Sequence, residues 1–177
     1  LAVALSTGAP RWEVAVGDPR GTTELERIAD ISGAPYVAGR DVCAVSYQGR
    51  IACFDTVSGT PRWGKAFSSD VGVDVDGSAV YAANERGTVQ AFARDTGTSI
   101  WQNDQLKNRR LSTPVSSSRT VAVGDYQGYI HFFSKDNGLL LARVNTDGSP
   151  IVGVPVRTDA NLIFQTQSGT VVAIAAE

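Results

Sequence analysis

Few side chains in this sequence of 177 residues could perform covalent or metal chemistry. Its two cysteines, Cys43 and Cys53, are too few for a disulfide scaffold and are not spaced as zinc ligands. The only histidine, His131, lies in the apolar run YIHFF, and no further ligands stand at a matching spacing. We therefore expect His131 to be a partly buried strand residue that makes one or two hydrogen bonds. The sequence also lacks a nucleophile elbow of the form G-x-S-x-G.

Acidic residues suggest calcium chemistry at one place, where Asp74, Asp76 and Gly77 resemble the start of a calcium-binding loop. Such a loop needs further oxygen ligands and a terminal glutamate, and Glu85 falls in the wrong place for that role. We therefore expect an outward-facing strand that ends in an Asp-Gly turn. The sequence predicts no metal site and no cofactor.

A charged cluster of Glu24, Glu26, Arg27 and Asp30 allows two interpretations. Long insertions on a rigid scaffold commonly carry binding residues, so the cluster could contact a partner. Alternatively it is a solvated loop in which Arg27 pairs with its neighbours, worth at most about 1 kcal/mol. The residues alone favour the solvated loop.

A locally basic segment, QLKNRRLSTP, contains Arg109 and Arg110. Short charge runs are usually exposed, so we expect a solvated loop here as well, with contact to a partner or an acidic peptide as the alternative.

The composition excludes some classes of partner. A net charge of -2, from 16 basic and 18 acidic residues, offers no electropositive surface for nucleic acid. No apolar stretch is long enough to cross a bilayer, so a soluble chain is expected. The sequence starts at Leu1 without a signal core, so we expect any targeting segment to lie upstream or to have been removed.

A repeat organises the chain. Four segments align without gaps, and their first glycines are 38, 41 and 41 residues apart: GRIACFDTVSGTPRW, GTVQAFARDTGTSIW, GYIHFFSKDNGLLLA and GTVVAIAAE. An earlier, incomplete copy is LAVALSTGAPRW. Each unit contains four short apolar runs separated by turns, without a helical pattern. Four strands in a period of roughly 40 residues are typical of a propeller blade.

The predicted fold is therefore all-β: a partial β-propeller of about four four-stranded antiparallel blades. We expect one domain over residues 1–177, with a blade end at 1–17, an insertion loop at 18–32, and blades at about 33–67, 70–103, 111–145 and 150–177. A half ring leaves two blade faces uncovered, so self-association or marginal stability is also expected.

The turns between the second and third strands end in glycine, as in Tyr47-Gln48-Gly49. This pattern predicts a type I turn followed by a glycine bulge. The resulting register places Cys43 opposite Cys53. The pair could form a cross-strand disulfide, or remain two small buried thiols, which is the more usual state of a free cysteine.

Tryptophan recurs four residues after a glycine in three of the units, at Trp12, Trp63 and Trp101. A large aromatic residue at one fixed place in each blade is expected to wedge against the next blade and to bury on the order of 200 Å². The next unit has Ala142 at that place, so its contact must be looser or differently filled.

The string A-x-x-D-x-x-S-G-x-x-x-W, from Ala52 to Trp63, resembles the tryptophan-docking blades of the quinoprotein (PQQ-like) propeller family. A more specific resemblance lies in GTTELERIADI, from Gly21 to Ile31, which is similar to an insertion in the BamB family of outer-membrane assembly lipoproteins. ALSTGAPRW and LSTPVSSSRTVAVGDYQGYIHFFSKDNG are similar to that family too.

The resemblance implies the C-terminal half of an eight-bladed propeller and a non-catalytic scaffold of the β-barrel assembly machinery. Such a scaffold binds the POTRA region of BamA, assists the folding and insertion of outer-membrane proteins, and could also bind those proteins unfolded. It lies at the periplasmic face of the outer membrane, held only by an N-terminal lipid anchor that would precede Leu1. The implied contact residues are Glu24, Glu26, Arg27 and Asp30, with Ser32 at the place of a second acidic residue of the family.

The alternative function is a fragment of a PQQ-dependent quinoprotein dehydrogenase. Such enzymes resemble the chain in blade sequence but need a catalytic Asp, calcium-ligating Glu and Asn, and often vicinal cysteines. The sequence has no vicinal cysteine pair, and its candidate carboxylates fall in expected turns or loops. A sensor domain of a receptor or kinase is a third interpretation.

Overall fold

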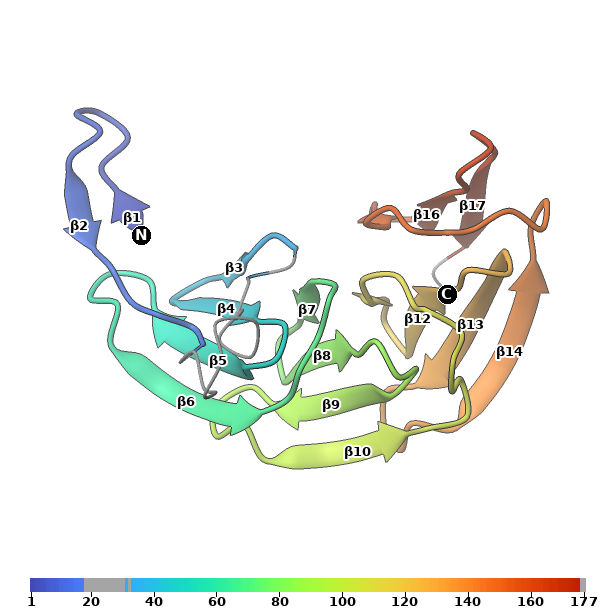
Figure 1. Ribbon diagram of the computed structural model, residues 1–177, viewed down its shortest axis with the longest axis horizontal. Helices are drawn as coiled ribbons and strands as arrows, with labels where there is room; N and C mark the ends of the chain where they lie inside the picture. Colours follow the sequence, from blue (N-terminus) through green and yellow to red (C-terminus); the bar gives the residue numbers. More distant parts are fainter. Residues whose placement is uncertain (18–30, 32, 176–177) are drawn as a thin grey trace, which may run out of the picture.

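The computed structural model of the chain describes residues 1–17, 31 and 33–175, and within these residues it contains 17 strands and no helix. The strands form five antiparallel sheets, which we call blades A to E in chain order (Figure 1). Blade A consists of β1 (Ala2–Val3) and β2 (Pro10–Trp12). Blade B consists of β3 (Tyr36–Ala38), β4 (Asp41–Val45), β5 (Arg50–Asp55) and β6 (Pro61–Ala66).

The other three blades repeat this order. Blade C consists of β7 (Val73–Val75), β8 (Ala79–Ala83), β9 (Val89–Ala93) and β10 (Ser99–Asn103). Blade D consists of β11 (Val115–Ser116), β12 (Thr120–Gly124), β13 (Tyr129–Ser134) and β14 (Leu140–Asn145). Blade E consists of β15 (Val156–Arg157), β16 (Asn161–Gln165) and β17 (Val171–Ala175).

The blades lie side by side along an open arc, with β6, β10 and β14 on its convex side (Figure 1). The first strands of successive blades, β3, β7, β11 and β15, contact one another on the inner side. Strands pair in chain order within every blade. The predicted all-β, partial propeller is therefore confirmed, with three four-stranded sheets, one three-stranded sheet and one two-stranded sheet.

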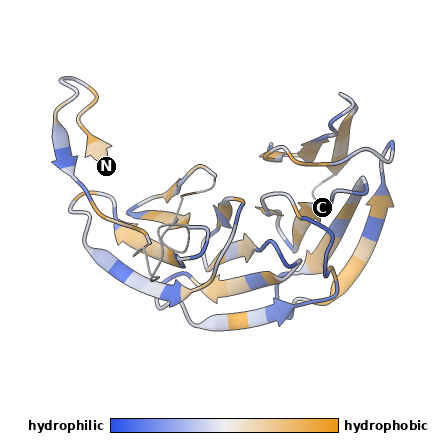
Figure 2. Cartoon of the chain, in the orientation of Figure 1, coloured by the Kyte–Doolittle hydropathy of each residue, from blue (hydrophilic) through white to orange (hydrophobic). Residues whose placement is uncertain are grey.

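The hydrophobic core lies between blades rather than within a single layer. Tyr81 of blade C and Phe133 of blade D belong to one buried cluster, and Phe132 of blade D and Phe164 of blade E belong to the next. The middle strands are thus covered on both faces, which explains their weak alternation. Hydrophilic residues appear more often on the outer strands β6 and β10 (Figure 2).

Cys43 and Cys53 lie directly opposite each other on β4 and β5, in the register that the glycine turn predicted. Their sulfur atoms form a disulfide, and their Cα atoms are 4.1 Å apart. Of the two alternatives for this pair, the structure contains the cross-strand bond rather than two thiols. Both residues are fully buried, so the bond joins two strands in the centre of blade B.

The predicted turn geometry is correct in three blades and wrong in blade B. Gly87, Gly128 and Gly169 have positive φ angles of 89°, 78° and 96°. In blade B the positive φ of 53° belongs to Gln48 and not to Gly49. A Cβ atom at position 49 would lie 1.9 Å from the hydroxyl oxygen of Ser46, so close approach is the reason for glycine there.

The expectation of an outward-facing strand at Asp74 is also wrong. β7 is an innermost strand, and only 4% of Asp74 is exposed. Its carboxylate accepts a hydrogen bond of 2.5 Å from the backbone N–H of Ser116 in blade D. Arg157 of blade E also reaches this carboxylate, at 3.4 Å, and donates to the carbonyl oxygen of Ser116. The inner strands of three blades are therefore joined by one buried carboxylate.

Candidate functional site

The geometry of the blade junctions fixes how the loops are presented. The Trp63 indole N–H donates to the carbonyl oxygen of Arg94 at 2.8 Å, and that of Trp101 donates to Lys135 at 2.7 Å. Trp12 makes the corresponding bond to Thr56 at 3.1 Å. Each indole thus reaches from the fourth strand of one blade to the next blade along the chain. This repeated contact holds neighbouring blades at a constant spacing.

Two of these junctions carry a second, reciprocal contact that sequence reasoning missed. The Arg94 side chain of blade C extends back to Asp41 of blade B, at 2.8 Å. Lys135 of blade D pairs in the same way with Asp76 of blade C. Burial opposes the ionised form of Asp76, but hydrogen bonds from Lys135 and backbone N–H groups prevail and lower its pKa to about 2. The sequence signal for these contacts is a basic residue, Arg94 or Lys135, at the same position of the two aligned repeats.

One rim of the arc is built from two kinds of loop, and we call it the hairpin rim. It contains the turns at residues 46–49, 84–87, 125–128 and 166–169, and the described parts of the connections between blades, at residues 13–17, 33–35, 67–72, 104–114 and 146–155. Backbone hydrogen bonds join the turns to the connections: the Ser69 N–H donates to the carbonyl oxygen of Ser46, and the Tyr126 N–H donates to that of Arg109. The opposite edge, which we call the turn rim, carries residues 39–40, 56–60, 76–78, 94–98, 117–119, 135–139 and 158–160.

The charged cluster predicted to bind a partner lies outside the described residues. Its members are Glu24, Glu26, Arg27, Asp30 and Ser32. Both described ends of that interval lie on the hairpin rim.

At the first end, the Arg50 guanidinium donates to the carbonyl oxygens of Val16, at 2.5 Å, and Ala15, at 3.3 Å. At the second end, Gly33 packs so closely on Gly72 that a Cβ atom at position 33 would lie 2.5 Å from the Gly72 nitrogen. The described ends of the insertion therefore lie beside the hairpin of blade B and beside the connection between blades B and C.

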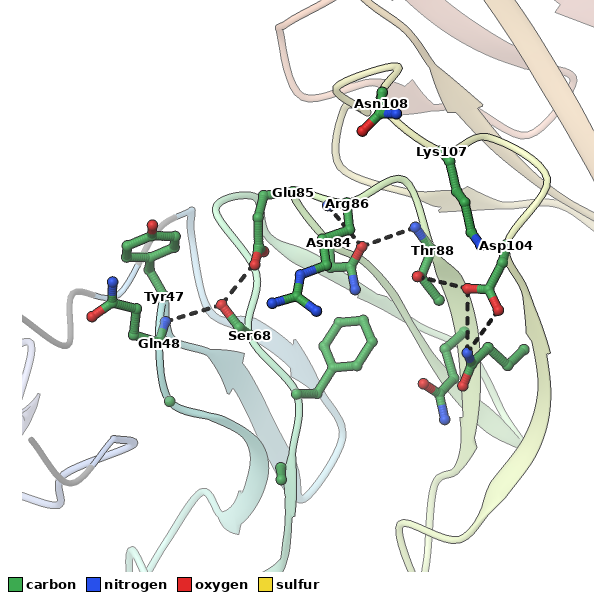
Figure 3. Close-up of a pocket in the computed structure, with 15 residues that line it drawn as sticks. Tyr47, Gln48, Ser68, Asn84, Glu85, Arg86, Thr88, Asp104, Lys107 and Asn108 are labelled. Atoms are coloured by element: carbon green, nitrogen blue, oxygen red, sulfur yellow. Dashed lines mark hydrogen bonds between the residues drawn. The ribbon is translucent and has the colours of Figure 1, made fainter. Parts of the chain in front are cut away.

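A polar groove of about 1030 Å³ opens on the hairpin rim between blades B and C (Figure 3). Ser68 lies on one wall, where its hydroxyl accepts from the Gln48 N–H at 3.0 Å and donates to Glu85 at 3.4 Å. On the other wall, a hydrogen bond from Thr88 lowers the pKa of Asp104. Side chains of both charges line the groove, so it suits a polar polypeptide segment better than a strongly charged ligand.

The rim of blade D is held by a buried carboxylate, Asp125. It accepts hydrogen bonds from Arg109 at 2.7 Å, from His131 at 2.8 Å, and from the backbone N–H groups of Gln127 and Tyr129. The expectation of a solvated Arg109 is therefore wrong, because a buried acceptor holds its guanidinium. Asp125 and His131 are 0% and 1% exposed, so the pair fixes a loop and does not face a substrate.

The Asp125 site predicts a pH dependence of stability. Burial alone would raise its pKa, but hydrogen bonds from His131, the Tyr129 N–H and Arg109 outweigh it and lower the pKa to about 2. The ordinary value is 3.8, so this stabilisation is complete above that pH and is lost as pH falls through about 2. Asp125 then contributes on the order of 2 kcal/mol.

Urea denaturation between pH 6 and 2 checks this prediction. Asp125→Asn is expected to be less stable near neutral pH and to lose less stability on acidification than the unsubstituted chain. The same acid-induced loss in both proteins would contradict the role given to Asp125.

Among residues 1–17, 31 and 33–175, no group of three or more His, Cys, Asp or Glu side chains is placed to hold a metal ion. Within the same residues, no helix is long and apolar enough to cross a membrane.

Comparison with known proteins identifies the family. The family model described as "Outer membrane protein assembly factor BamB" matches residues 1–103 and 85–177. A relative of the same description from Bordetella pertussis is 45% identical over 177 residues, covering 99% of this chain and 46% of the relative. The chain spans about half the length of the curated relatives it matches.

Solved structures agree. The crystal structure of BamB from Moraxella catarrhalis is 33% identical with a TM-score of 0.89, and the match covers 97% of this chain and 51% of that one. A europium-containing methanol dehydrogenase is 15% identical with a TM-score of 0.58, over 68% of this chain and 27% of that chain, which shows a shared fold alone. The repeated blades, the docked tryptophans and these matches together show that the chain belongs to the family of the outer membrane protein assembly factor BamB.

Proposed function

We propose that the chain is part of a non-catalytic scaffold of outer-membrane protein assembly, and that its hairpin rim binds the POTRA region of BamA. The observation that carries the proposal is the convergence of the insertion ends, the hairpins and the polar groove on one rim. Loops that a rigid scaffold gathers on one side are a common binding surface. The names of the relatives support the assembly role.

The disulfide supports a location outside the cytosol. Structural disulfides persist in oxidising compartments, and the bacterial periplasm is one of them. Cys43 and Cys53 are bonded and fully buried. We therefore place the proposed activity at the periplasmic face of the outer membrane, where unfolded outer-membrane proteins are also available as partners.

The proposal predicts that substitutions in the insertion lower the affinity for BamA. Arg27→Ala and Asp30→Ala are each expected to weaken binding to a purified BamA POTRA fragment by about 5- to 30-fold, equivalent to about 1–2 kcal/mol. Biolayer interferometry with the immobilised 177-residue chain measures this. Asp95→Ala is the matched control, because Asp95 is exposed on the turn rim. Unchanged affinity in both insertion variants would contradict the proposal.

The quinoprotein alternative makes the opposite prediction for activity. If the chain is a scaffold, addition of pyrroloquinoline quinone and calcium should give no dye-linked alcohol oxidation above the rate of the free cofactor. Turnover that depends on the chain would favour the enzyme.

A further inference from the structure

Blade B differs from blades C, D and E at one pair of opposite positions, where it has Cys43 and Cys53. In the aligned repeats, the other three blades have a larger side chain opposite a smaller one at these positions. The pairs are Tyr81 with Ala91, Ala122 with Phe132, and Ile163 with Ala173. Non-covalent packing is therefore sufficient for three blades, and the disulfide is an addition that is specific to blade B.

The disulfide lies underneath blade C. Cys43 and Cys53 are each 0% exposed, and they belong to the buried cluster that contains Val80 and Phe92 of blade C. Phe67, in the connection between the two blades, joins this cluster and packs edge-on against Phe92, with ring centroids 5.5 Å apart. Blades B and C both have all four strands, so the cover over the bond is complete.

Formation of the bond needs an access that the folded chain does not give. A disulfide forms when a thiolate attacks a sulfur atom of another disulfide, so the oxidant has to contact the cysteine directly. Blade C prevents this contact once it has packed on blade B. Cys43 and Cys53, however, are only ten residues apart on two strands of one hairpin. Hairpins form in about 1–10 μs, so the two residues can meet before blade C is in place.

We propose that a thiol–disulfide oxidoreductase oxidises Cys43 and Cys53 before blade C packs on blade B. The thiolate of one cysteine attacks the disulfide of the oxidoreductase and forms a mixed disulfide with it. The thiolate of the other cysteine attacks the sulfur atom of the first, which forms the Cys43–Cys53 bond and releases the oxidoreductase with two thiols. Two electrons and two protons thus pass from the chain to the oxidoreductase.

A fast oxidant is needed because folding competes with oxidation. Disulfide formation takes seconds to hours, depending on the oxidant, whereas small domains fold in microseconds to seconds. Without a catalyst, blade C would cover the two thiols before they react. Two unbonded sulfur atoms also need more room than a bonded pair, so the trapped thiols would overpack the cluster around Phe92.

The hairpin joined by the bond also carries part of the hairpin rim. At its tip, the Gln48 N–H donates to Ser68 on a wall of the polar groove. Arg50, at the start of β5, donates to the carbonyl oxygen of Val16, beside the first described end of the insertion. Oxidation of the cysteine pair therefore stabilises the hairpin that contacts both features.

Reduction of the folded, oxidised chain tests the cover over the bond. Dithiothreitol is expected to break the bond at least about 100-fold more slowly in buffer than in concentrated urea, because blade C has to move away first. Alkylation followed by mass spectrometry counts the free thiols. Similar rates in buffer and in urea would show that the sulfur atoms are accessible in the folded chain, and would overturn the proposed order.

Refolding tests the order of the two events. The reduced, unfolded chain is diluted into buffer, and a purified periplasmic oxidoreductase with an oxidised Cys-x-x-Cys site is added at the start or after folding. Early addition should oxidise the pair at least about tenfold faster than late addition. Tryptophan fluorescence reports packing, because Trp63 belongs to the same cluster. Equal rates in a reduced chain that has reached the native fluorescence would contradict the proposal. Failure of the reduced chain to reach that fluorescence would support it, because oxidation then has to come first.

Trapping the mixed disulfide tests whether the chain is a substrate. Cys43→Ser and Cys53→Ser each leave one thiol without its partner, so at least one of these variants should accumulate a covalent adduct with the oxidoreductase. Non-reducing electrophoresis detects the adduct. A chain with both substitutions is the matched control and should form none. Absence of an adduct from both single variants would show that this class of oxidoreductase does not act on the chain.

Discussion

Replacing Trp63 by alanine is expected to lower the free energy of unfolding by about 3–5 kcal/mol. The indole lies between blades B and C, 8% exposed, and its ring packs on Gly97 of the next blade. The substitution removes this packing, the hydrogen bond to the Arg94 carbonyl, and the aromatic contact with Phe92 at 6.2 Å between ring centroids. Urea denaturation followed by circular dichroism measures the loss.

Two further variants distinguish docking from general loss of a large side chain. Trp63→Phe keeps most of the packing but leaves the partly buried Arg94 carbonyl without its donor, so a smaller loss of about 1–3 kcal/mol is expected. Trp12→Ala should cost less than Trp63→Ala, because Trp12 is only half-buried and belongs to a two-stranded sheet. A loss of less than about 1 kcal/mol for Trp63→Ala would contradict the docking role.

Gly87→Ala is expected to destabilise the chain by more than about 3 kcal/mol, for two reasons that act together. Gly87 has a φ of 89°, which disfavours any side chain. A Cβ atom there would also lie 1.9 Å from the Leu106 carbonyl oxygen and 2.5 Å from its carbon. These are backbone atoms of the following connection, so the hairpin or the connection has to move.

Gly77→Ala provides the matched control for this prediction. Gly77 also lies in a turn of blade C, but a Cβ atom there would meet nothing within 4 Å. Its substitution should change stability by less than about 0.5 kcal/mol. Because Gly87 lies on the hairpin rim, Gly87→Ala should also disturb the groove, and the two thermal melts are compared directly. Similar melting temperatures for both variants would contradict the close approach at Gly87.

The blade architecture could be predicted because the same sequence pattern recurs in several repeats. Every four-stranded sheet places its glycine turn and its fourth strand at the same offset, so one interpretation accounts for all of them. The register of Cys43 and Cys53 followed from the three-residue length of the turn, although its glycine does not have the predicted positive φ. Local rules of this kind depend on neighbouring residues, which a sequence shows directly.

Contacts between blades could not be predicted in the same way. The partners Asp41 and Arg94 are 53 residues apart, and Arg157 donates to the hydroxyl oxygen of Tyr36 across 121 residues. The sequence could show that these residues are charged or polar, but it could not show which blade faces which turn. Asp74 was misplaced for this reason, since an isolated strand does not indicate whether it lies on the inner or outer side of a ring.

The blade B turn shows a different limit. Its glycine follows the repeat, yet the left-handed residue is Gln48, and a Cβ atom at position 49 would meet the Ser46 hydroxyl instead. A recurring glycine indicates that a side chain is excluded at that position. It does not show whether a positive φ angle or a close neighbouring atom excludes the side chain. The predicted contact residues of the insertion, including Asp30, remain a prediction because they lie outside the described residues.

Site-specific photo-cross-linking tests the central claim that the hairpin rim is the binding surface. A photoreactive phenylalanine analogue is placed at Gln48 or Tyr126 on the hairpin rim, and at Val57 or Thr96 on the turn rim; all four residues are exposed. After irradiation with the BamA POTRA fragment, we expect adducts from Gln48 or Tyr126 and none from Val57 or Thr96. Adducts from the turn rim alone, or from neither rim, would contradict the account.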